Sequence, residues 1–153
     1  MNVMKKISIT LSLILFTLVI YAAKPDAKEA KPIELTESVF IEKVHDFVRT
    51  PNEWVYKGDK PAIVDFHATW CGPCKQLAPT LTALAAEYGD DIYIYKVDVD
   101  KEPDIARAFG IRSVPSLLFI PHEGRPQMGQ GNIPKESLKK VIDEFMLGKE
   151  PTE

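Results

Sequence analysis

The chain has 153 residues, of which 45% are hydrophobic and 27% charged, a balance typical of a globular protein with room for one domain and an appendage. Its net charge of −3, without any basic run interleaved with aromatic residues, argues against a nucleic-acid partner. Its two cysteines are too few for a disulfide-stapled scaffold and supply only half the ligands of a closed zinc site, so no metal is expected. Redox chemistry is the stronger interpretation.

The N-terminal residues have the layout of a secretory signal peptide. Lys5 and Lys6 precede an uncharged, apolar run from Ile7 to Ala23 that ends in small residues. The run is slightly long for a signal core and slightly short for a membrane span of about 20 residues, so an uncleaved anchor is the alternative to cleavage near Ala22 or Ala23. The two lysines orient the segment so that the rest of the chain is exported, which predicts a periplasmic or other extracytoplasmic location.

The composition divides the chain into four parts. Residues 1–23 form the signal peptide or membrane anchor, and residues 24–35 are expected to be a flexible linker because they begin with a charged, proline-containing stretch without periodicity. Residues 36–148 carry the periodic patterns of one folded domain, and residues 149–153 are a short tail.

Helical and strand-like patterns alternate through the domain. In chain order, we expect a helix over 36–50, a loop over 50–60, a strand over 62–68, a helix from the cysteines to 88, a strand over 92–99, a short helix over 103–110, strands over 117–120 and 126–130, and a closing helix over 134–147. The strand, helix, strand order predicts a right-handed βαβ unit with two parallel strands. Pro126 places the last strand at an edge of the sheet, because proline cannot donate to a ladder. The fold class is therefore α/β.

The chemistry is concentrated in residues 62–75, which read AIVDFHATWCGPCK. Cys71 falls beyond the carboxyl end of a strand, where parallel sheets place their sites. It also begins a helix, whose free N–H groups and dipole favour a thiolate, so Cys71 is expected to be the nucleophile. Cys74, one turn deeper, suits the role of resolving thiol. Gly72 and Pro73 add little bulk between the cysteines while restricting the turn.

The run VDFHATWCGPCKQLAP, followed by SVPS and by a glycine near the last helix, resembles the thioredoxin family over residues 36–147. The resemblance implies a thioredoxin fold, with a central mixed β-sheet flanked by helices, and a redox-active disulfide between Cys71 and Cys74 without any other cofactor. It also implies that Pro115 is a cis-proline facing this disulfide, and that the Val114 backbone pairs with an extended substrate. An ordinary proline that starts a strand is the alternative.

The same resemblance assigns substrate binding to the residues around the disulfide. These are Trp70, Gly72, Pro73, Val114 and Gly131. Trp70 is expected to be a surface aromatic beside the cysteines, with core packing as the alternative.

Asp65 interrupts an apolar strand, where burial should raise its pKa toward the range of a general base. In thioredoxins the matching aspartate helps to remove the proton of the second cysteine through water, and a lysine of the next strand accompanies it. Lys96 matches that lysine. The alternative is that Asp65 is a buried polar group with satisfied hydrogen bonds.

His67 departs from the family pattern, which often has an aromatic residue there. A histidine that protonates would change the electric field at Cys71, but we favour the interpretation that its ring replaces aromatic packing. His45, on an expected helix surface, and His122, in a turn, are assigned no role.

These observations together predict an exported thiol-disulfide oxidoreductase that reduces disulfides in extracytoplasmic proteins. The dipeptide of Gly72 and Pro73 resembles that of reducing family members, whereas oxidising and isomerising relatives usually have a histidine in it. Outside the cytoplasm the electrons would come from a membrane dithiol donor. We expect a monomer that meets the membrane only through an uncleaved N-terminal segment. The alternatives are a dedicated reductase for cytochrome maturation or metallochaperone thiols, and a non-catalytic binding module on the same scaffold.

Overall fold

The computed structural model describes residues 31–151, so the predicted signal or anchor segment and most of the predicted linker lie outside the described residues. A five-stranded sheet has the strand order β1-β3-β2-β4-β5. The elements are β1 (Ile33–Glu34), α2 (Glu37–Lys43), β2 (Ala62–His67), α3 (Gly72–Tyr88), β3 (Tyr93–Asp98), α4 (Pro103–Ala108), β4 (Ser116–Ile120), β5 (Gln127–Gln130), α5 (Lys135–Lys140) and η2 (Val141–Met146).

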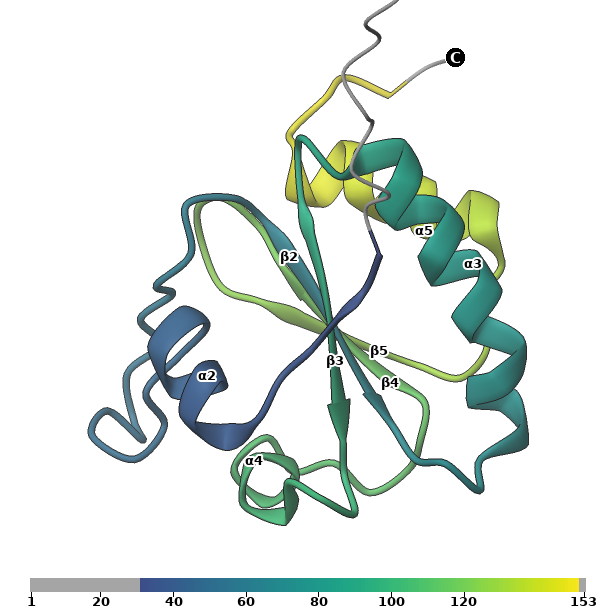
Figure 1. The fold of residues 1–153 in the computed structure, drawn as a ribbon. Coiled ribbons are helices and arrows are strands. Elements are labelled where there is room, and N and C mark those ends of the chain that lie inside the picture. The colour runs from purple at the N-terminus through teal and green to yellow at the C-terminus, as the bar shows by residue number, and fades with distance from the viewer. Residues whose placement is uncertain (1–30, 152–153) are drawn as a thin grey trace, which may run out of the picture.

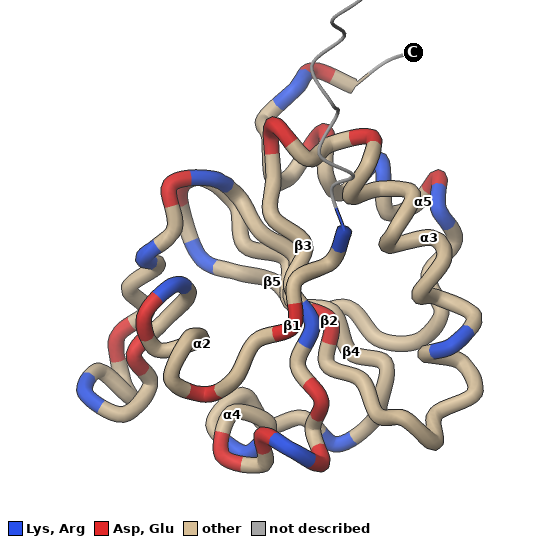
Figure 2. The backbone as a smooth tube through the Cα atoms, viewed as in Figure 1, with Lys and Arg blue, Asp and Glu red and all other residues tan. Residues whose placement is uncertain are grey.

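The sheet is mixed, and helices cover both of its faces. Strand β3 pairs in parallel with β2, as the βαβ pattern predicts, while β4 is antiparallel to β2 and β5 closes the edge beyond β4. Helices α3 and α5 lie on one face and α2 and α4 on the other (Figure 1). Acidic and basic positions are interspersed over these elements without a large field of one sign (Figure 2). The predicted α/β fold with a mixed central sheet is confirmed.

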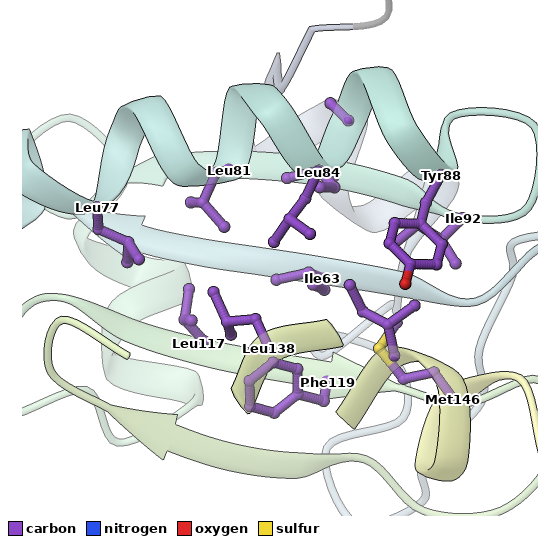
Figure 3. Close-up of a cluster of buried hydrophobic side chains, with 13 residues drawn as sticks. Ile63, Leu77, Leu81, Leu84, Tyr88, Ile92, Leu117, Phe119, Leu138 and Met146 are labelled. Carbon is purple, nitrogen blue, oxygen red and sulfur yellow. The ribbon is translucent and has the colours of Figure 1, made fainter. Parts of the chain in front are cut away.

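The larger part of the core lies between α3 and the sheet. Leu77, Leu81 and Leu84 of α3 are fully buried, as their spacing of three and four residues predicts. They share one cluster with Ile63 of β2 and with side chains of β4, α5 and η2 (Figure 3). This packing fixes α3 over β2, so the first turn of the helix lies at the carboxyl end of that strand.

The opposite face carries an aromatic cluster. Phe40 of α2 and Phe66 of β2 are fully buried there, and the rings of Phe40 and Phe109 are 5.3 Å apart between centroids. Trp54 and Tyr56 stack on each other and pack against the same cluster, so these two loop residues cover an edge of the core.

The predicted linker ends earlier than residue 35, so that boundary is wrong. Ile33 and Glu34 form β1, which pairs in parallel with Tyr95 and Lys96 of β3, and Leu35 is buried. A strand of two residues is too short to show an alternating pattern, so the polar composition of the neighbouring residues concealed it. The first strand of the domain therefore brings an acidic side chain to the edge of the sheet.

The first helix is also shorter than predicted. Helix α2 ends at Lys43, and His45 is buried with its Nδ1 atom 3.2 Å from the carbonyl oxygen of Val55. The expectation that His45 lies on a helix surface is therefore wrong. The side chain of Asp46 accepts a hydrogen bond from the backbone N–H of Arg49 at 3.0 Å. The backbone turns there instead of continuing the helix, although the apolar residues of this segment keep a helical spacing in the sequence.

The closing helix changes its winding halfway along. After α5, residues 141–146 form a π-helix, and the N–H of Leu147 donates to the carbonyl of Ile142 at 2.9 Å. Leu138, Ile142 and Met146, spaced by four residues, are all buried. Residues four apart lie on the same face of a helix, so this spacing accounts for their common burial. The burial of Met146 was not predicted.

Candidate active site

The two cysteines form a disulfide at the start of α3. Their sulfur atoms are 2.09 Å apart, and the Cα atoms are 5.3 Å apart. Cys71 occupies the N-cap position, where its Sγ accepts a hydrogen bond from the backbone N–H of Cys74 at 3.2 Å. A free helix N–H directed at this sulfur stabilises negative charge on it. The geometry thus fits the predicted nucleophile.

Cys71 and Cys74 are both buried, with buried apolar residues on one side of them and exposed residues on the other. Ala68 belongs to the same buried cluster, and Val99 and Val114 pack against it. On the solvent side, Trp70 is 69% exposed, and Gly72 and Pro73 are exposed as well. The position of Trp70 on the surface confirms that prediction and excludes core packing. A protein substrate thus meets an exposed rim before it reaches the sulfur atoms.

The peptide bond between Val114 and Pro115 is cis, as the resemblance implies. Gly131 joins this part of the site, because its backbone N–H donates to the carbonyl oxygen of Pro115 at 2.9 Å. Gly131 has a φ of +86°, a conformation that residues with a side chain rarely adopt, so glycine is required at this turn. Three of the predicted site residues are therefore brought together by backbone geometry.

Asp65 lies in the sheet below the first turn of α3. Alternation along β2 places it on the same face as Ile63, two residues earlier, which packs against α3. Asp65 is 1% exposed, and its Oδ1 atom has no hydrogen-bond partner among the described residues. Burial raises the pKa of Asp65 to about 6, although electrostatic interaction with His67 and Lys96 opposes the rise. A carboxyl group of this kind exchanges its proton near neutral pH.

Lys96 stands opposite Asp65 in the register of β3 and β2. Its ammonium group, however, pairs with Glu34 of β1, with 3.7 Å between Nζ and Oε2. The other carboxylate oxygen of Glu34 lies 3.2 Å from Nε2 of His67. The sequence therefore identified Lys96 and His67 but missed Glu34, which connects them. The family pattern offered no signal for it, because Glu34 lies in the segment interpreted as a linker.

Comparison with known proteins agrees with this geometry. The family model described as thioredoxin matches residues 42–144. A thioredoxin of Borreliella burgdorferi is 45% identical over 113 residues, which cover 74% of this chain and 96% of that protein. The chain belongs to the thioredoxin family.

Other relatives come from chloroplasts. The M-type chloroplastic thioredoxin of Spinacia oleracea is 40% identical over 94 residues, covering 61% of this chain and 52% of that protein. The crystal structure of chloroplastic thioredoxin z superposes with a TM-score of 0.65 at 26% identity, covering 77% of this chain and 96% of that one. Together with the cysteine pair, these relatives make the chain a thioredoxin-type protein-disulfide oxidoreductase.

One further contact in this thioredoxin was not predicted. The indole Nε1 of Trp70 donates to Oδ2 of Asp100 at 2.8 Å, and the backbone N–H of Asp100 donates to Oδ1 of Asp98 at 3.1 Å. Asp98 ends β3 and Asp100 follows it, so both carboxylates lie at the same carboxyl edge of the sheet as the disulfide. The hydrogen bond holds Trp70 beside the cysteines although most of its surface is exposed.

Residues 31–151 contain neither a membrane-spanning helix nor a cluster of metal ligands. None of the helices in this part of the chain has the length and the apolar character needed to cross a membrane. The same residues contain no group of three or more His, Cys, Asp or Glu side chains arranged to hold a metal ion.

Proposed function

We propose that this thioredoxin is exported and works as a reductant of disulfides in extracytoplasmic proteins. The observation that carries the reaction is Cys71 at the N-cap of α3, with its sulfur accepting the N–H of Cys74. The direction rests on the dipeptide of Gly72 and Pro73 between the cysteines, which resembles that of reducing relatives. Export rests on Lys5 and Lys6 ahead of the apolar run.

The reaction consists of two exchanges. The Cys71 thiolate attacks one sulfur of the substrate disulfide, a mixed disulfide forms, and the first substrate thiolate leaves and takes a proton from water. The Cys74 thiol then loses its proton to the Asp65 carboxylate through water and attacks the Cys71 sulfur. The second substrate thiolate leaves as the Cys71–Cys74 disulfide forms in the protein. Two electrons have passed to the substrate.

The surroundings of the disulfide support these roles. Val114 packs against the cysteine cluster, and Pro115 follows it through a cis peptide bond. An extended substrate segment pairs with the Val114 backbone, while Trp70 offers an exposed aromatic surface beside it. We assign substrate binding to these residues together with Gly72, Pro73 and Gly131.

Export requires a donor that works outside the cytoplasm. The oxidised protein takes up two electrons from a membrane dithiol, because soluble nicotinamide is not available there. Strand β1 begins at Ile33, so cleavage near Ala22 or Ala23 would remove no residue of the sheet. An uncleaved segment would instead tether the domain to the membrane that holds the donor.

Insulin reduction with dithiothreitol as the electron source tests the activity. We expect the wild-type protein to accelerate precipitation of the insulin B chain, and Cys71→Ser to abolish the acceleration. Glu123→Gln, an exposed change in the turn before β5, is the matched control and should behave as wild type. A wild-type rate equal to that of dithiothreitol alone would point instead to a binding module on this scaffold.

Cell fractionation tests the location. The full chain and a version that starts at Lys24 are expressed in a Gram-negative host, and the periplasmic, membrane and cytoplasmic fractions are probed. We expect the full chain outside the cytoplasm, free or bound to the membrane, and the shortened chain inside. A full chain that stays in the cytoplasmic fraction would refute export but leave the reductase activity untouched.

A further inference from the structure

Three charged residues lie in one row across the sheet beside the disulfide. The register places Glu34 of β1 opposite Lys96 of β3, and Lys96 opposite Asp65 of β2. Paired residues of neighbouring strands point to the same face, so the three side chains share the face that α3 covers. Lys96 therefore stands between two carboxyl groups, one at the edge of the sheet and one in its interior. Acidic and basic positions meet near the labels of β1 and β2 in Figure 2.

Lys96 pairs with only one of these two carboxyl groups. Its Nζ lies 3.7 Å from Glu34, whose side chain is 51% exposed, while no ion pair among residues 31–151 joins it to Asp65. The exposed partner costs less desolvation, which explains the preference. His67, two residues after Asp65 on β2, extends to the same Glu34 carboxylate at 3.2 Å. Glu34 thus holds the Lys96 ammonium in an ion pair and also contacts the His67 ring, and neither of these contacts reaches Asp65.

The remaining neighbours leave Asp65 without a competing charge. On β4 the residue opposite is Leu117, and the buried side chains of α3 on this face of the sheet are uncharged. On β3, Asp98 is buried but already accepts the N–H of Asp100 and lies 3.7 Å from Lys101.

Glu34, His67 and Lys96 are therefore the groups that act on Asp65 electrostatically. Glu34 raises the pKa of Asp65, whereas His67 and Lys96 lower it, and all three act on a pKa already raised by burial.

We infer that Glu34 is a positioning residue of the exchange reaction, which holds the Lys96 ammonium off Asp65 and so keeps Asp65 free to take the Cys74 proton near neutral pH. This role rests on the proposed function, in which Asp65 is the base. Without Glu34, Lys96 would turn to Asp65 and stabilise its carboxylate. The ionised, paired carboxylate is a weaker base for a thiol.

The test compares wild type, Glu34→Gln and Asp65→Asn, with Glu123→Gln as the control for loss of one negative charge. The first measurement is the titration of the Asp65 carboxyl carbon by NMR in the oxidised protein. The second is the pH dependence of the resolution step, in which Cys74 releases the second substrate thiol from the mixed disulfide. Glutamine keeps the size of the Glu34 side chain at a half-exposed position, so the fold should persist.

In Glu34→Gln we expect the Asp65 titration, and the rising limb of the rate profile, to move to lower pH by roughly 0.5 to 1 unit. The plateau rate should fall about threefold, because the base is weaker. Glu123→Gln should leave both curves in place. In a Lys96→Met background the shift caused by Glu34→Gln should shrink by more than half, since the effect passes through Lys96. Loss of a half-exposed ion pair alone would change stability by little and move neither curve.

Two results would overturn the inference, and they are distinguishable. If the Asp65 titration stays within about 0.2 unit in Glu34→Gln while Asp65→Asn slows resolution, Glu34 has no positioning role but Asp65 remains the base. If Asp65→Asn resolves the mixed disulfide at the wild-type rate at every pH, the proposed base is wrong, and the role of Glu34 falls with it.

Discussion

Lys96 faces Asp65 across the register of two neighbouring strands, but it forms no ion pair with it. The Asp65 carboxyl is buried, one of its oxygens has no hydrogen-bond partner within residues 31–151, and burial raises its pKa to about 6. This isolation matters for stability as well as for proton transfer, because an unpaired carboxylate in the interior is unfavourable.

Asp65→Asn should stabilise the oxidised protein at pH 8. The pKa is raised from 3.8 to about 6 in the folded state. Between these values the folded state binds more protons than the unfolded state, so the contribution of Asp65 to stability falls as pH rises and stays low above about pH 6. The gain at pH 8 is at most about 3 kcal/mol, from about 1.4 kcal/mol per pKa unit.

Chemical denaturation of both proteins at pH 8 and pH 4 measures the gain for Asp65→Asn. The difference in unfolding free energy should be large at pH 8 and nearly absent at pH 4. An equal difference at the two pH values would mean that ionisation of Asp65 is not its cause.

Cys74→Ser should trap the mixed disulfide, because Cys71 can still attack but no resolving thiol remains. Incubation with oxidised substrate should give a covalent complex that is visible on a non-reducing gel and lost on addition of dithiothreitol. The matched variant Cys71→Ser should give no such complex. Equal yields from the two variants would contradict the assignment of Cys71 as nucleophile.

Trp70→Ala should weaken substrate binding without unfolding the protein. Because Trp70 is 69% exposed, its loss should change the unfolding free energy by no more than about 0.5 kcal/mol. The KM for insulin should rise several-fold, since an exposed aromatic surface beside the cysteines is lost. Trp54→Ala is the matched control, and it should cost about 2 kcal/mol of stability because Trp54 packs in the aromatic cluster. An unchanged KM in Trp70→Ala would refute the binding role.

Gly129→Ala should destabilise the edge of the sheet. A Cβ atom at Gly129 would lie 2.8 Å from a ring carbon of Phe119, closer than packed atoms allow, and 3.0 Å from Cδ1 of Ile133, which would have to shift. We expect a loss of about 1 to 2 kcal/mol in the free energy of unfolding. Gln127→Ala, an exposed change in the same strand, should stay within about 0.5 kcal/mol. Equal losses in the two variants would indicate a general weakness of β5 rather than a clash.

Sequence patterns predicted the central βαβ unit because its elements are long and strongly periodic. Leu77, Leu81 and Leu84 recur along one face of α3, and all three are buried. Cys71 and Cys74 were predicted as nucleophile and resolving thiol from their place at the start of a helix. Pro115 was predicted as a cis-proline only through the family resemblance, since the sequence pattern alone does not show a cis bond. The fold and the cysteine pair at the centre of the site can therefore be predicted from the sequence.

Strand β1 and the contacts of Glu34 could not be predicted from the sequence. Two residues cannot display a period, and the pairing of Ile33 and Glu34 depends on β3, whose sequence lies far away along the chain. His45 was misplaced for a related reason, because its burial depends on the carbonyl oxygen of Val55 in a loop without a pattern. Contacts that are made only by tertiary structure leave no local signal.

In the proposed function, Cys71 and Cys74 deliver electrons to protein disulfides outside the cytoplasm. The redox state of this pair in living cells tests it most directly, by acid quenching, alkylation of free thiols and separation of the alkylated from the unalkylated protein. We expect most of the exported protein to carry the pair as a dithiol, and we expect loss of the membrane donor to convert it to the disulfide. A pair that is predominantly a disulfide in unperturbed cells would contradict the direction of electron flow proposed for this thioredoxin.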